Sequence, residues 1–410
     1  MNESYINKSL AGNKSCPVVQ CLFVNVCIPI EECQSRIQEY IFPKTSEWVF
    51  IAMYFILFVF GLIGNSLVCY VIWTSQHMQT VVNIFIFNLA VADFLVILFC
   101  LPPTMLADVT ESWYLGEIMC KVVPFIQTTS VSVSVLTLTA ISVERYYAIC
   151  HPLRMRLKSR TIITTIIIIW ITGISVATPD LVFGNLLKTH EEHITQYLQV
   201  CRKKWNEKQD NAYHLFLVIA LYSIPICLMA CTYSVICRHL WKKDLPGMSE
   251  SENRRPLNLQ PISSPENQLC SRRRAAKMLM TIVVVFAICY LPVHIMNLIR
   301  YTDVFRSIGE TLIPIIALVS HILCYFNSAV NPVIYNFMSA KFRKEFKMAL
   351  SCCKCSKSRH MPGLTSSGRN KSTNIRSERY TQHTMSTRQG WLITNSGILR
   401  KTSCPQDKYG

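Results

Sequence analysis

The chain has 410 residues, of which 51% are hydrophobic and only 16% are charged. A soluble domain carries about 25% charged residues, whereas residues 48–73 contain none. Because this run is longer than the ~20 residues that a helix needs to cross a bilayer, the composition excludes one large soluble core and predicts a membrane protein.

Seven apolar segments follow one another along the chain and are predicted to be transmembrane helices. Their approximate ranges are 47–73, 81–106, 117–149, 162–184, 213–240, 276–300 and 311–335. The third is the least apolar, since it contains Lys121, Gln127 and several Ser and Thr residues. That composition is typical of a helix surrounded by other helices rather than by lipid. The predicted fold class is an all-α membrane protein with a seven-transmembrane helix bundle.

A short amphipathic eighth helix is predicted directly after the bundle. Residues 339–350 place Phe342, Phe346 and Leu350 four residues apart, with Lys and Arg residues beside them. Such a helix is suited to lying on the cytosolic leaflet. The three cysteines after it either are S-palmitoylated or stay reduced and unmodified. They are Cys352, Cys353 and Cys355.

The distribution of basic residues predicts the orientation. The loops near residues 151–160 and 241–275 and the C-terminal tail are rich in Lys and Arg, which places them in the cytosol. An odd number of crossings then puts the N-terminus outside the plasma membrane. Three Asn-x-Ser sequons agree, because glycans are added on that side. They are Asn2, Asn7 and Asn13.

Four regions are therefore expected. They are an extracellular, glycosylated, Cys-containing tail (1–46), the bundle (47–338), the amphipathic helix with the palmitoylation segment (339–355) and a disordered cytoplasmic tail (356–410). The 241–275 loop, rich in Pro, Ser, Asn and Glu, is predicted to be mobile. The net charge of +17 raises nucleic acid as a partner. A basic tail beside a membrane is better explained by anionic lipid, so we expect contact with membrane lipid and none with nucleic acid.

Cysteines near the predicted outer face indicate disulfides. Cys120 begins the third segment and Cys201 precedes the fifth, both in an oxidising compartment. A bond between them would close a loop of about 80 residues, worth roughly 4 kcal/mol in the chain-entropy model. Four further cysteines allow two more bonds in three pairings, among which the sequence does not choose. They are Cys16, Cys21, Cys27 and Cys33.

Asp93 lies within the second apolar segment, where a charged group costs on the order of 3 kcal/mol. We interpret it as a buried polar switch that holds a sodium ion together with polar residues of the first and seventh segments. The alternative is a protonated, hydrogen-bonded structural Asp. The candidate partners are Asn65, Asn327, Ser328 and Asn331. No other metal or cofactor is expected.

Three further motifs lie at helix ends or interrupt helices. Glu144, Arg145 and Tyr146 end the third segment, where Arg145 can pair with Glu144 or be released to another partner. Pro292, in the CYLP sequence of the sixth segment, removes a backbone hydrogen bond and is predicted to kink the helix. The NPVIY sequence of residues 331–335 ends the seventh segment with a second Pro break.

The ordered set of these motifs resembles the rhodopsin-like G-protein-coupled receptors over about residues 48–351. The residues that carry the resemblance are Asn65, Asp93, Cys120, Glu144, Arg145, Tyr146, Trp170, Cys201, Pro225, Cys289, Tyr290, Leu291, Pro292, Asn331, Pro332 and Tyr335. The resemblance implies a heterotrimeric G protein and arrestin as partners. It also implies that a set of residues forms the switch and G-protein-coupling elements. They are Asp93, Glu144, Arg145, Tyr146, Tyr233, Tyr290, Pro292, Asn331, Pro332 and Tyr335.

A closer resemblance is to orexin receptors and the invertebrate allatotropin receptors. It rests on PFIQTTSVSVSVLTL (124–138), YYAICHPL (146–153), FAICYLP (286–292) and NPVIYNFMSAKFRKEFK (331–347). Tyr290 stands where most rhodopsin-like receptors carry Trp. Tyr146 looks more like the allatotropin branch, because orexin receptors usually show Trp after the Arg.

This resemblance implies a ligand pocket of neutral hydrogen-bonding groups, suited to a C-terminal carboxamide more than to a free carboxylate. For each residue taken singly, the alternative interpretation is a structural polar residue whose hydrogen bonds are satisfied inside the bundle. Gln127 also argues against an amine receptor, which has Asp there. The implied pocket residues are Thr104, Asp108, Gln127, Thr128, His214, Asn297, His321 and Tyr325.

The chain also departs from the orexin pattern. Cys201 is followed by Arg202, Lys203 and Lys204 where orexin receptors carry acidic residues, and Asp180 replaces a Gln. A basic loop disfavours a basic peptide by repulsion, so the orexin peptide itself is not carried over. Arg272 stands where some family members have an acidic partner for the Arg that corresponds to Arg145, so that ionic lock is absent or formed differently.

The function predicted is a receptor for an extracellular, C-terminally amidated neuropeptide of allatotropin or orexin type, signalling through Gq and calcium release. A different amidated neuropeptide and a non-signalling decoy receptor are alternatives. A transporter is disfavoured, because the chain has no internal repeat and a single acid in mid-membrane. An enzyme is not expected, because no nucleophile–base pair, metal-ligand cluster or phosphate loop is present.

Overall fold

The computed structural model describes residues 19–20, 27–28, 30–45, 47–151, 159–187, 199–242, 265–300, 302 and 312–357. The chain divides into a unit of residues Met1–Leu350, which holds the bundle, and a unit of residues Ser351–Gly410. The sequons at Asn2, Asn7 and Asn13 lie outside the described residues, as do Cys16 and Cys21.

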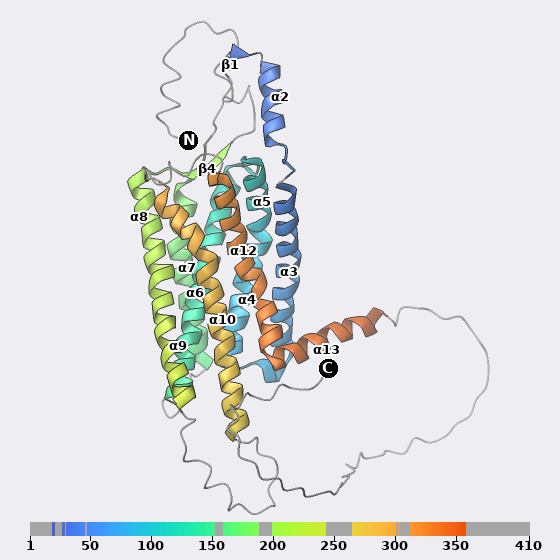
Figure 1. The fold of residues 1–410 in the computed structure, drawn as a ribbon, viewed down its shortest axis with the longest axis vertical. Helices are drawn as coiled ribbons and strands as arrows, with labels where there is room; N and C mark the ends of the chain where they lie inside the picture. The colour runs from blue at the N-terminus through green and yellow to red at the C-terminus, as the bar shows by residue number, and fades with distance from the viewer. Residues whose placement is uncertain are drawn as a thin grey trace, which may run out of the picture. The chain divides into compact units, whose positions relative to one another are not determined.

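Seven described helices are long and apolar enough to cross a membrane, as the sequence predicted. They are α3 (Glu47–Thr74), α4 (Val81–Phe99), α6 (Gly116–Cys150), α7 (Ser159–Phe183), the continuous run α8 (Glu207–Leu217), η2 (Val218–Ser223) and α9 (Ile224–Lys242), then α10 (Pro265–Ile299) and α12 (Leu312–Met338). The helix α6 packs against α4, α7 and α9, whereas α12 packs against α3, α4 and α10 (Figure 1). The weakly apolar third segment is therefore surrounded by other helices, as predicted.

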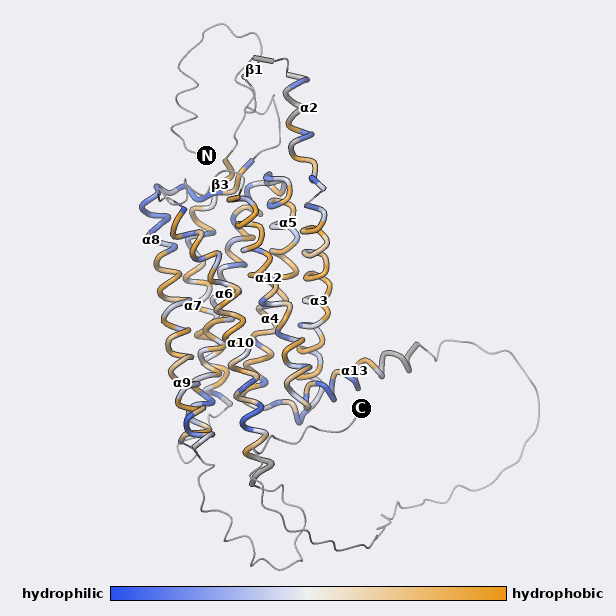
Figure 2. Tube along the Cα trace, in the orientation of Figure 1, coloured by the Kyte–Doolittle hydropathy of each residue, from blue (hydrophilic) through white to orange (hydrophobic). Residues whose placement is uncertain are grey.

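Shorter elements complete the described fold. They are β1 (Val19–Gln20), β2 (Cys27–Ile28), α2 (Ile30–Ile41), η1 (Gln76–Met78), α5 (Leu101–Thr110), β3 (Gly184–Leu187), β4 (Val200–Lys203) and α13 (Ala340–Lys357). Strands β3 and β4 form an antiparallel hairpin. The hydropathy colouring places most polar residues at the helix ends (Figure 2). We call the end of the bundle that carries β3 and β4 the hairpin end, and the opposite end the α13 end.

Two sequence expectations need correction. Residues 265–275, predicted as part of a mobile loop, are the first turns of α10. Pro265 suits a first helical position, and the Arg273 guanidinium fastens these turns to α9 by donating to the Leu240 carbonyl at 2.8 Å. The second segment is not one helix to residue 106, because it breaks at Cys100 and resumes as α5. Pro102 and Pro103 lack the N–H groups that would continue the helical hydrogen bonds.

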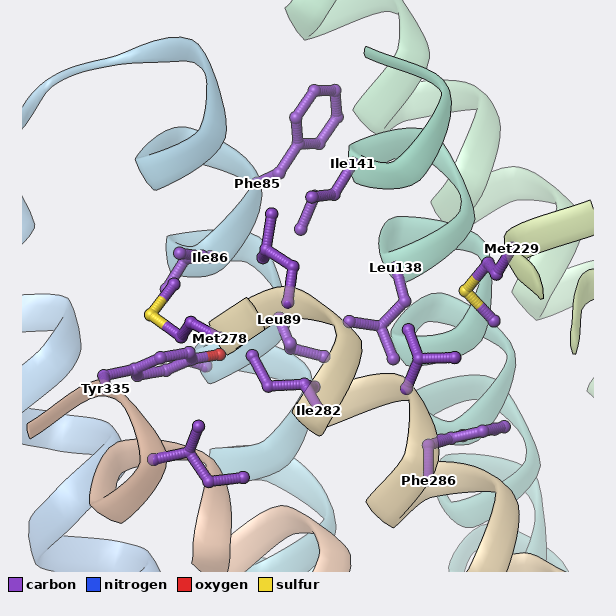
Figure 3. Packing of buried hydrophobic residues seen from close by; sticks show 14 of the residues in the cluster. Phe85, Ile86, Leu89, Leu138, Ile141, Met229, Met278, Ile282, Phe286 and Tyr335 are labelled. Atoms are coloured by element: carbon purple, nitrogen blue, oxygen red, sulfur yellow. The ribbon is translucent and has the colours of Figure 1, made fainter. Parts of the chain in front are cut away.

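The larger apolar core fills the α13 half of the bundle. In Figure 3, Leu89 of α4 and Leu138 of α6 lie beside Ile282 and Phe286 of α10, and Tyr335 of α12 lies near Met278. Apolar side chains also cover the outside of the bundle, among them Phe55 on α3 and Ile167 and Ile171 on α7. An apolar outer surface is what a bilayer requires of a spanning helix.

Two glycines allow α3 to approach its neighbours closely. A Cβ atom at Gly64 would lie 2.9 Å from Cβ and Cγ of Pro332, and one at Gly61 would lie 2.3 Å from Cδ1 of Ile97. Small residues at helix contacts are a common packing device in membrane bundles. Gly64 therefore sets the distance between α3 and the Pro break of α12.

We expect Gly64→Val to lower the free energy of unfolding by about 1–3 kcal/mol, because the added methyls must displace the Pro332 ring. The measurement is the thermal unfolding midpoint of the purified protein in detergent. Ser66→Val is the matched control, since Ser66 is exposed on the same helix. Equal midpoints for the two variants would contradict this account of the contact.

Candidate functional site

The hairpin end is closed by a disulfide and by backbone contacts. Cys120 at the start of α6 is bonded to Cys201 of β4, which confirms the predicted pair. Cys201 pairs with Leu186 in the hairpin register. The backbone N–H of Trp113, in the loop between α5 and α6, donates to the Gln199 carbonyl at 2.8 Å. These contacts fix β4 across the top of α6.

Beside the hairpin, α3, α5 and α12 bring a polar group together around Asp108. The Tyr54 hydroxyl donates to the Asp108 carboxylate at 2.7 Å, and His321 Nδ1 lies 3.0 Å from both carboxylate oxygens. The Thr104 and Tyr325 hydroxyls are hydrogen-bonded to each other at 2.7 Å. The Tyr54 and Tyr325 rings meet edge to face at 6.2 Å. We call these five residues the Asp108 cluster.

Four of the eight predicted pocket residues therefore lie in one described cluster. Tyr54 was missed, because nothing in the apolar pattern of the first helix distinguishes a Tyr that faces an acid from one that faces lipid. The cluster contains no Lys or Arg among the side chains that contact Asp108 in the described residues. Asp108 is thus an acid stabilised by a hydroxyl and an imidazole rather than by a permanent cation.

A second polar group joins α7, β4 and α8. Lys203 Nζ lies 2.9 Å from Asp180 Oδ1, and the Tyr213 hydroxyl donates to Asp180 Oδ2 at 3.1 Å. Trp205 meets the Tyr213 ring edge to face at 5.2 Å. We call Asp180, Lys203, Trp205 and Tyr213 the hairpin anchor. Asp180 and Lys203 both differ from the orexin-receptor pattern, but their positions in the sequence do not reveal that they form a pair.

The remaining predicted pocket residues lie at the same end without joining one network. His214 Nε2 is 3.7 Å from Asp210 Oδ2 on α8, and Thr128 of α6 lies near Tyr213. Asn297 of α10 accepts from Arg300 at 3.1 Å. Gln127 is half-buried, and its amide makes no hydrogen bond to any residue that the structure describes. Arg300 lies within electrostatic range of both His214 and His321.

Buried polar groups cross the middle of the bundle. Asn331 Nδ2 donates to Asp93 Oδ2 at 2.8 Å, and Asn65 Nδ2 donates to the Ser328 carbonyl at 3.0 Å. Four acceptor oxygens in this region are buried and meet no donor within hydrogen-bond geometry among the described residues, although Ser328 lies close to Asp93. They are Asp93 Oδ1, Asn65 Oδ1, Asn327 Oδ1 and Asn331 Oδ1. Unsatisfied buried acceptors of this kind indicate a site for a water or a cation.

Two irregularities lie along the helices that lead to the α13 end. The π-turn η2 precedes Pro225 at the start of α9, and Pro292 lies inside α10. The Tyr222 hydroxyl donates to the Ala287 carbonyl at 2.7 Å, on the helical stretch just before Pro292. Tyr290 contacts Phe286, with ring centroids 4.7 Å apart. Breaks of this kind are the usual positions at which a long helix bends.

At the α13 end, Arg145 Nη2 donates to its neighbour Glu144 at 2.6 Å. Tyr233 of α9 is buried and lies within electrostatic range of both. The Arg145 guanidinium has no carboxylate partner on α10 in the part of the chain that the structure describes. Arg272 is exposed, so the acidic partner that some relatives place there is replaced by a cation. The Tyr146 ring lies 5.3 Å from that of His151, and Tyr146 also packs, half-buried, against the larger apolar core.

The eighth helix forms as α13, but its apolar face has a different partner from the one predicted. Phe342 stacks on Tyr335 at 5.3 Å, and Phe342 and Phe346 are buried against the bundle. Leu350 alone of the three stays exposed. An apolar helix face has the same sequence period whether lipid or protein covers it. The sequence therefore could not distinguish a helix on the leaflet from a helix packed on the bundle. Cys352, Cys353 and Cys355 fall in α13, but their side chains lie outside the described residues.

These features define a membrane-spanning helical receptor: seven spanning helices, a disulfide-fixed hairpin, and motif residues at mid-bundle and at the α13 end. Residues 64–335 match the family described as "7 transmembrane receptor (rhodopsin family)". The chain belongs to that family, which confirms the predicted fold and class and makes it a multi-pass receptor of the plasma membrane rather than an enzyme.

Two relatives are similar over most of their length. The chain is 34% identical over 310 residues to the QRFP-like peptide receptor of Branchiostoma floridae, covering 75% of this chain and 78% of that one. It is 32% identical over 317 residues to the pyroglutamylated RF-amide peptide receptor of Mus musculus, covering 76% of this chain and 72% of that one. Neither name is that of an orexin or allatotropin receptor, so the closer resemblance stays a prediction.

Proposed function

We propose that this chain is a G-protein-coupled receptor for an amidated neuropeptide whose C-terminus is Arg-Phe-amide or a close variant. The observation that carries the proposal is the polar lining of the hairpin end. Thr104, Tyr325 and Gln127 are neutral hydrogen-bonding groups, and Asp108 is an acid with no Lys or Arg partner among the described side chains. The name of the Mus musculus relative refers to an RF-amide peptide and that of the Branchiostoma floridae relative to a QRFP-like peptide, and both names support a peptide ligand.

The chemistry of the lining separates an amide from an acid. A C-terminal carboxamide both donates and accepts hydrogen bonds, so it suits the half-buried Gln127 amide, which lacks a described partner. A free carboxylate would instead be repelled by Asp108 and Asp210, and like charges at an interface select against the wrong ligand. The guanidinium of the peptide would take the place of His321 on the Asp108 carboxylate, where a bidentate charged pair is among the strongest hydrogen-bonded contacts.

In this proposal the hairpin end is extracellular and the α13 end is cytosolic, as the positive-inside rule predicts. Asn2, Asn7 and Asn13 carry glycans, and Cys352, Cys353 and Cys355 are palmitoylation sites. Peptide binding bends α10 at Pro292 and opens a cytosolic cleft beside Arg145. Shifting a 1:99 population to 99:1 takes about 5.5 kcal/mol of differential binding, and a nanomolar peptide binds with about 12 kcal/mol. The proposed partners are Gq, with calcium release, and arrestin.

A sodium ion at Asp93 is part of the same proposal. The unsatisfied oxygens of Asp93, Asn65, Asn327 and Asn331 fit a hard cation, which prefers oxygen ligands of this type. Asp93 and the three amides would hold it. The ion would supply the positive charge that a buried carboxylate otherwise lacks.

A second candidate is a peptide of the allatotropin or orexin type. The motif resemblance over residues 286–292 and 331–347 favours it, and its ligands are also amidated. The two candidates therefore differ in the peptide sequence and not in the amide. Direct binding of both peptide classes distinguishes them.

The test is equilibrium binding of a synthetic heptapeptide ending in Arg-Phe-amide to membranes that contain the receptor. We expect the free-acid form to bind at least about 100-fold more weakly, and Gln127→Ala to reduce this discrimination. Equal binding of the two forms, with surface expression verified, would remove the amide assignment. Saturable binding of an allatotropin-type amide alone would favour the second candidate.

Asp108→Asn is expected to lower the affinity of the receptor for the Arg-Phe-amide peptide about 10- to 100-fold. The reason is that it removes one member of a partly buried charge pair. Replacing the peptide Arg by citrulline should cost a similar factor. If the two groups contact each other, combining both changes costs little more than either change alone. Fully additive losses would contradict the pairing. Glu117→Gln is the control, since Glu117 pairs with Lys121 on the exposed face of α6.

A further inference from the structure

The two departures from the orexin pattern at this end of the bundle meet each other in space. Asp180 lies near the end of α7, and Lys203 ends β4. Their charged atoms are 2.9 Å apart, with side-chain exposures of 3% for Asp180 and 16% for Lys203. Asp180 stands where orexin receptors carry Gln, and Lys203 stands where they carry an acidic residue. The positive charge of Lys203 therefore neutralises the negative charge of Asp180. The two substitutions form one unit.

Each charge of the pair has further partners. Lys203 Nζ lies 4.0 Å from the centre of the Tyr213 ring and 5.1 Å from that of Trp205. The second carboxylate oxygen of Asp180 accepts from the Tyr213 hydroxyl at 3.1 Å. A buried ion pair is tolerated only when such additional contacts satisfy both groups, and aromatic faces stabilise an ammonium at this range. The pair lies in a complete polar and aromatic shell.

The shell lies at the base of the hairpin. Gly184 starts β3 directly after α7 and pairs with Lys203 in the register. A Cβ atom at Gly184 would lie 2.6 Å from the Asp180 carbonyl oxygen, so the chain turns here in close contact with α7. The backbone N–H of Lys204 returns to the Phe183 carbonyl at 2.8 Å. The disulfide at Cys201 holds the same strand two residues earlier, on α6.

We propose that Asp180, Lys203 and Tyr213 are positioning residues that fasten the hairpin to α7 and α8 as a second, non-covalent attachment beside the disulfide. This attachment fixes the position of β4 relative to the proposed ligand site. Because Lys203 neutralises Asp180, Asp108 rather than Asp180 receives the guanidinium of the peptide. The last statement rests on the proposed function, whereas the attachment itself does not.

The attachment is tested without ligand, by hydrogen exchange of the purified full-length receptor followed by mass spectrometry. Asp180→Asn and Lys203→Met are each expected to accelerate exchange of the β4 amides on the order of tenfold, with exchange in α3 and α4 unchanged. Lys204→Met is the matched control, because Lys204 is exposed on the adjacent position. Unchanged exchange in both variants would overturn the proposal.

Two further variants keep the test decisive if a single charge removal prevents folding. Tyr213→Phe removes only the hydroxyl donor and is expected to give a smaller acceleration confined to the same strand. Asp180→Leu combined with Lys203→Met removes both charges together, and it should exchange more slowly than either single variant, since no unpaired buried charge remains. Exchange as fast as or faster than the sum of the single effects would contradict a direct pair.

The ligand arm uses the heptapeptide ending in Arg-Phe-amide and its citrulline analogue. Lys203→Met should speed dissociation about tenfold while the ratio of affinities for the two peptides stays constant, because Asp108 is unchanged. A changed ratio would mean that Asp180 contacts the ligand and would overturn the assignment of the guanidinium to Asp108. If the peptide does not bind even the unmodified receptor, the exchange measurement still decides the attachment.

Discussion

Replacing Arg145 with Gln is expected to reduce agonist-stimulated nucleotide exchange on the G protein more than about 100-fold while peptide affinity changes little. Arg145 lies at the α13 end, hydrogen-bonded only to Glu144 of its own helix among the described residues. Because no described acid on α10 pairs with it, this cation is the group that can be released to a partner when α10 moves. Gln keeps a hydrogen-bonding amide but loses the charge and the planar fork of the guanidinium.

The measurement is GTP exchange on purified Gq with receptor in detergent and the amidated peptide as agonist. Arg145→Lys should retain a small part of the activity, since it keeps the charge alone. Arg272→Gln is the control, because Arg272 is exposed and has no described partner. Exchange within about threefold of the unmodified receptor in Arg145→Gln would show that Arg145 is not the coupling residue.

Removing the disulfide is expected to abolish high-affinity peptide binding and most surface expression. Cys120 and Cys201 are separated by 81 residues, and a cross-link over a loop of this size is worth about 4 kcal/mol in the chain-entropy model. Cys120 is fully buried, so its loss also leaves a gap beside β4. The hairpin would then be held by the Asp180–Lys203 attachment and by the backbone hydrogen bonds from Trp113 to Gln199 and from Lys204 to Phe183.

Cys120→Ala, Cys201→Ala and the double variant should be equally impaired, because each removes the same bond. The measurement is surface labelling together with peptide binding for all three. Cys227→Ala is the control, since Cys227 is an exposed free cysteine on α9. Losses that add up in the double variant would indicate that the two cysteines act separately.

Local and topological features were predictable from the sequence. The seven spans follow from apolar length, which depends on each segment alone, and the Cys120–Cys201 bond follows from both cysteines lying on one side of the membrane. The helical start of α10 was predictable in principle, since Ser264 and Pro265 precede a run of good helix formers. The preceding residues are rich in Pro, Ser, Asn and Glu, so this helix start was interpreted as part of the loop.

Apart from the disulfide and the Asp93–Asn331 hydrogen bond, contacts between distant segments were not predictable. Tyr54 reaches Asp108 from another helix, and Asp180 reaches Lys203 across a hairpin. The sequence gives the residue types but not which helix faces meet. Likewise, the period of Phe342 and Phe346 defines an apolar face without saying whether lipid or Tyr335 covers it. The residues that set the shape of the hairpin end make such contacts between distant segments, so the sequence alone could not identify them.

The most direct test of the proposed function is intracellular calcium in cells that express the chain, challenged with the Arg-Phe-amide heptapeptide and its free-acid form. We predict a nanomolar response to the amide, a response to the acid only at concentrations about 100-fold higher, and loss of the amide response in Gln127→Ala. Calcium and cAMP that stay flat with the amide, in cells with verified surface expression, would contradict the proposal and leave a rhodopsin-family receptor with a different ligand.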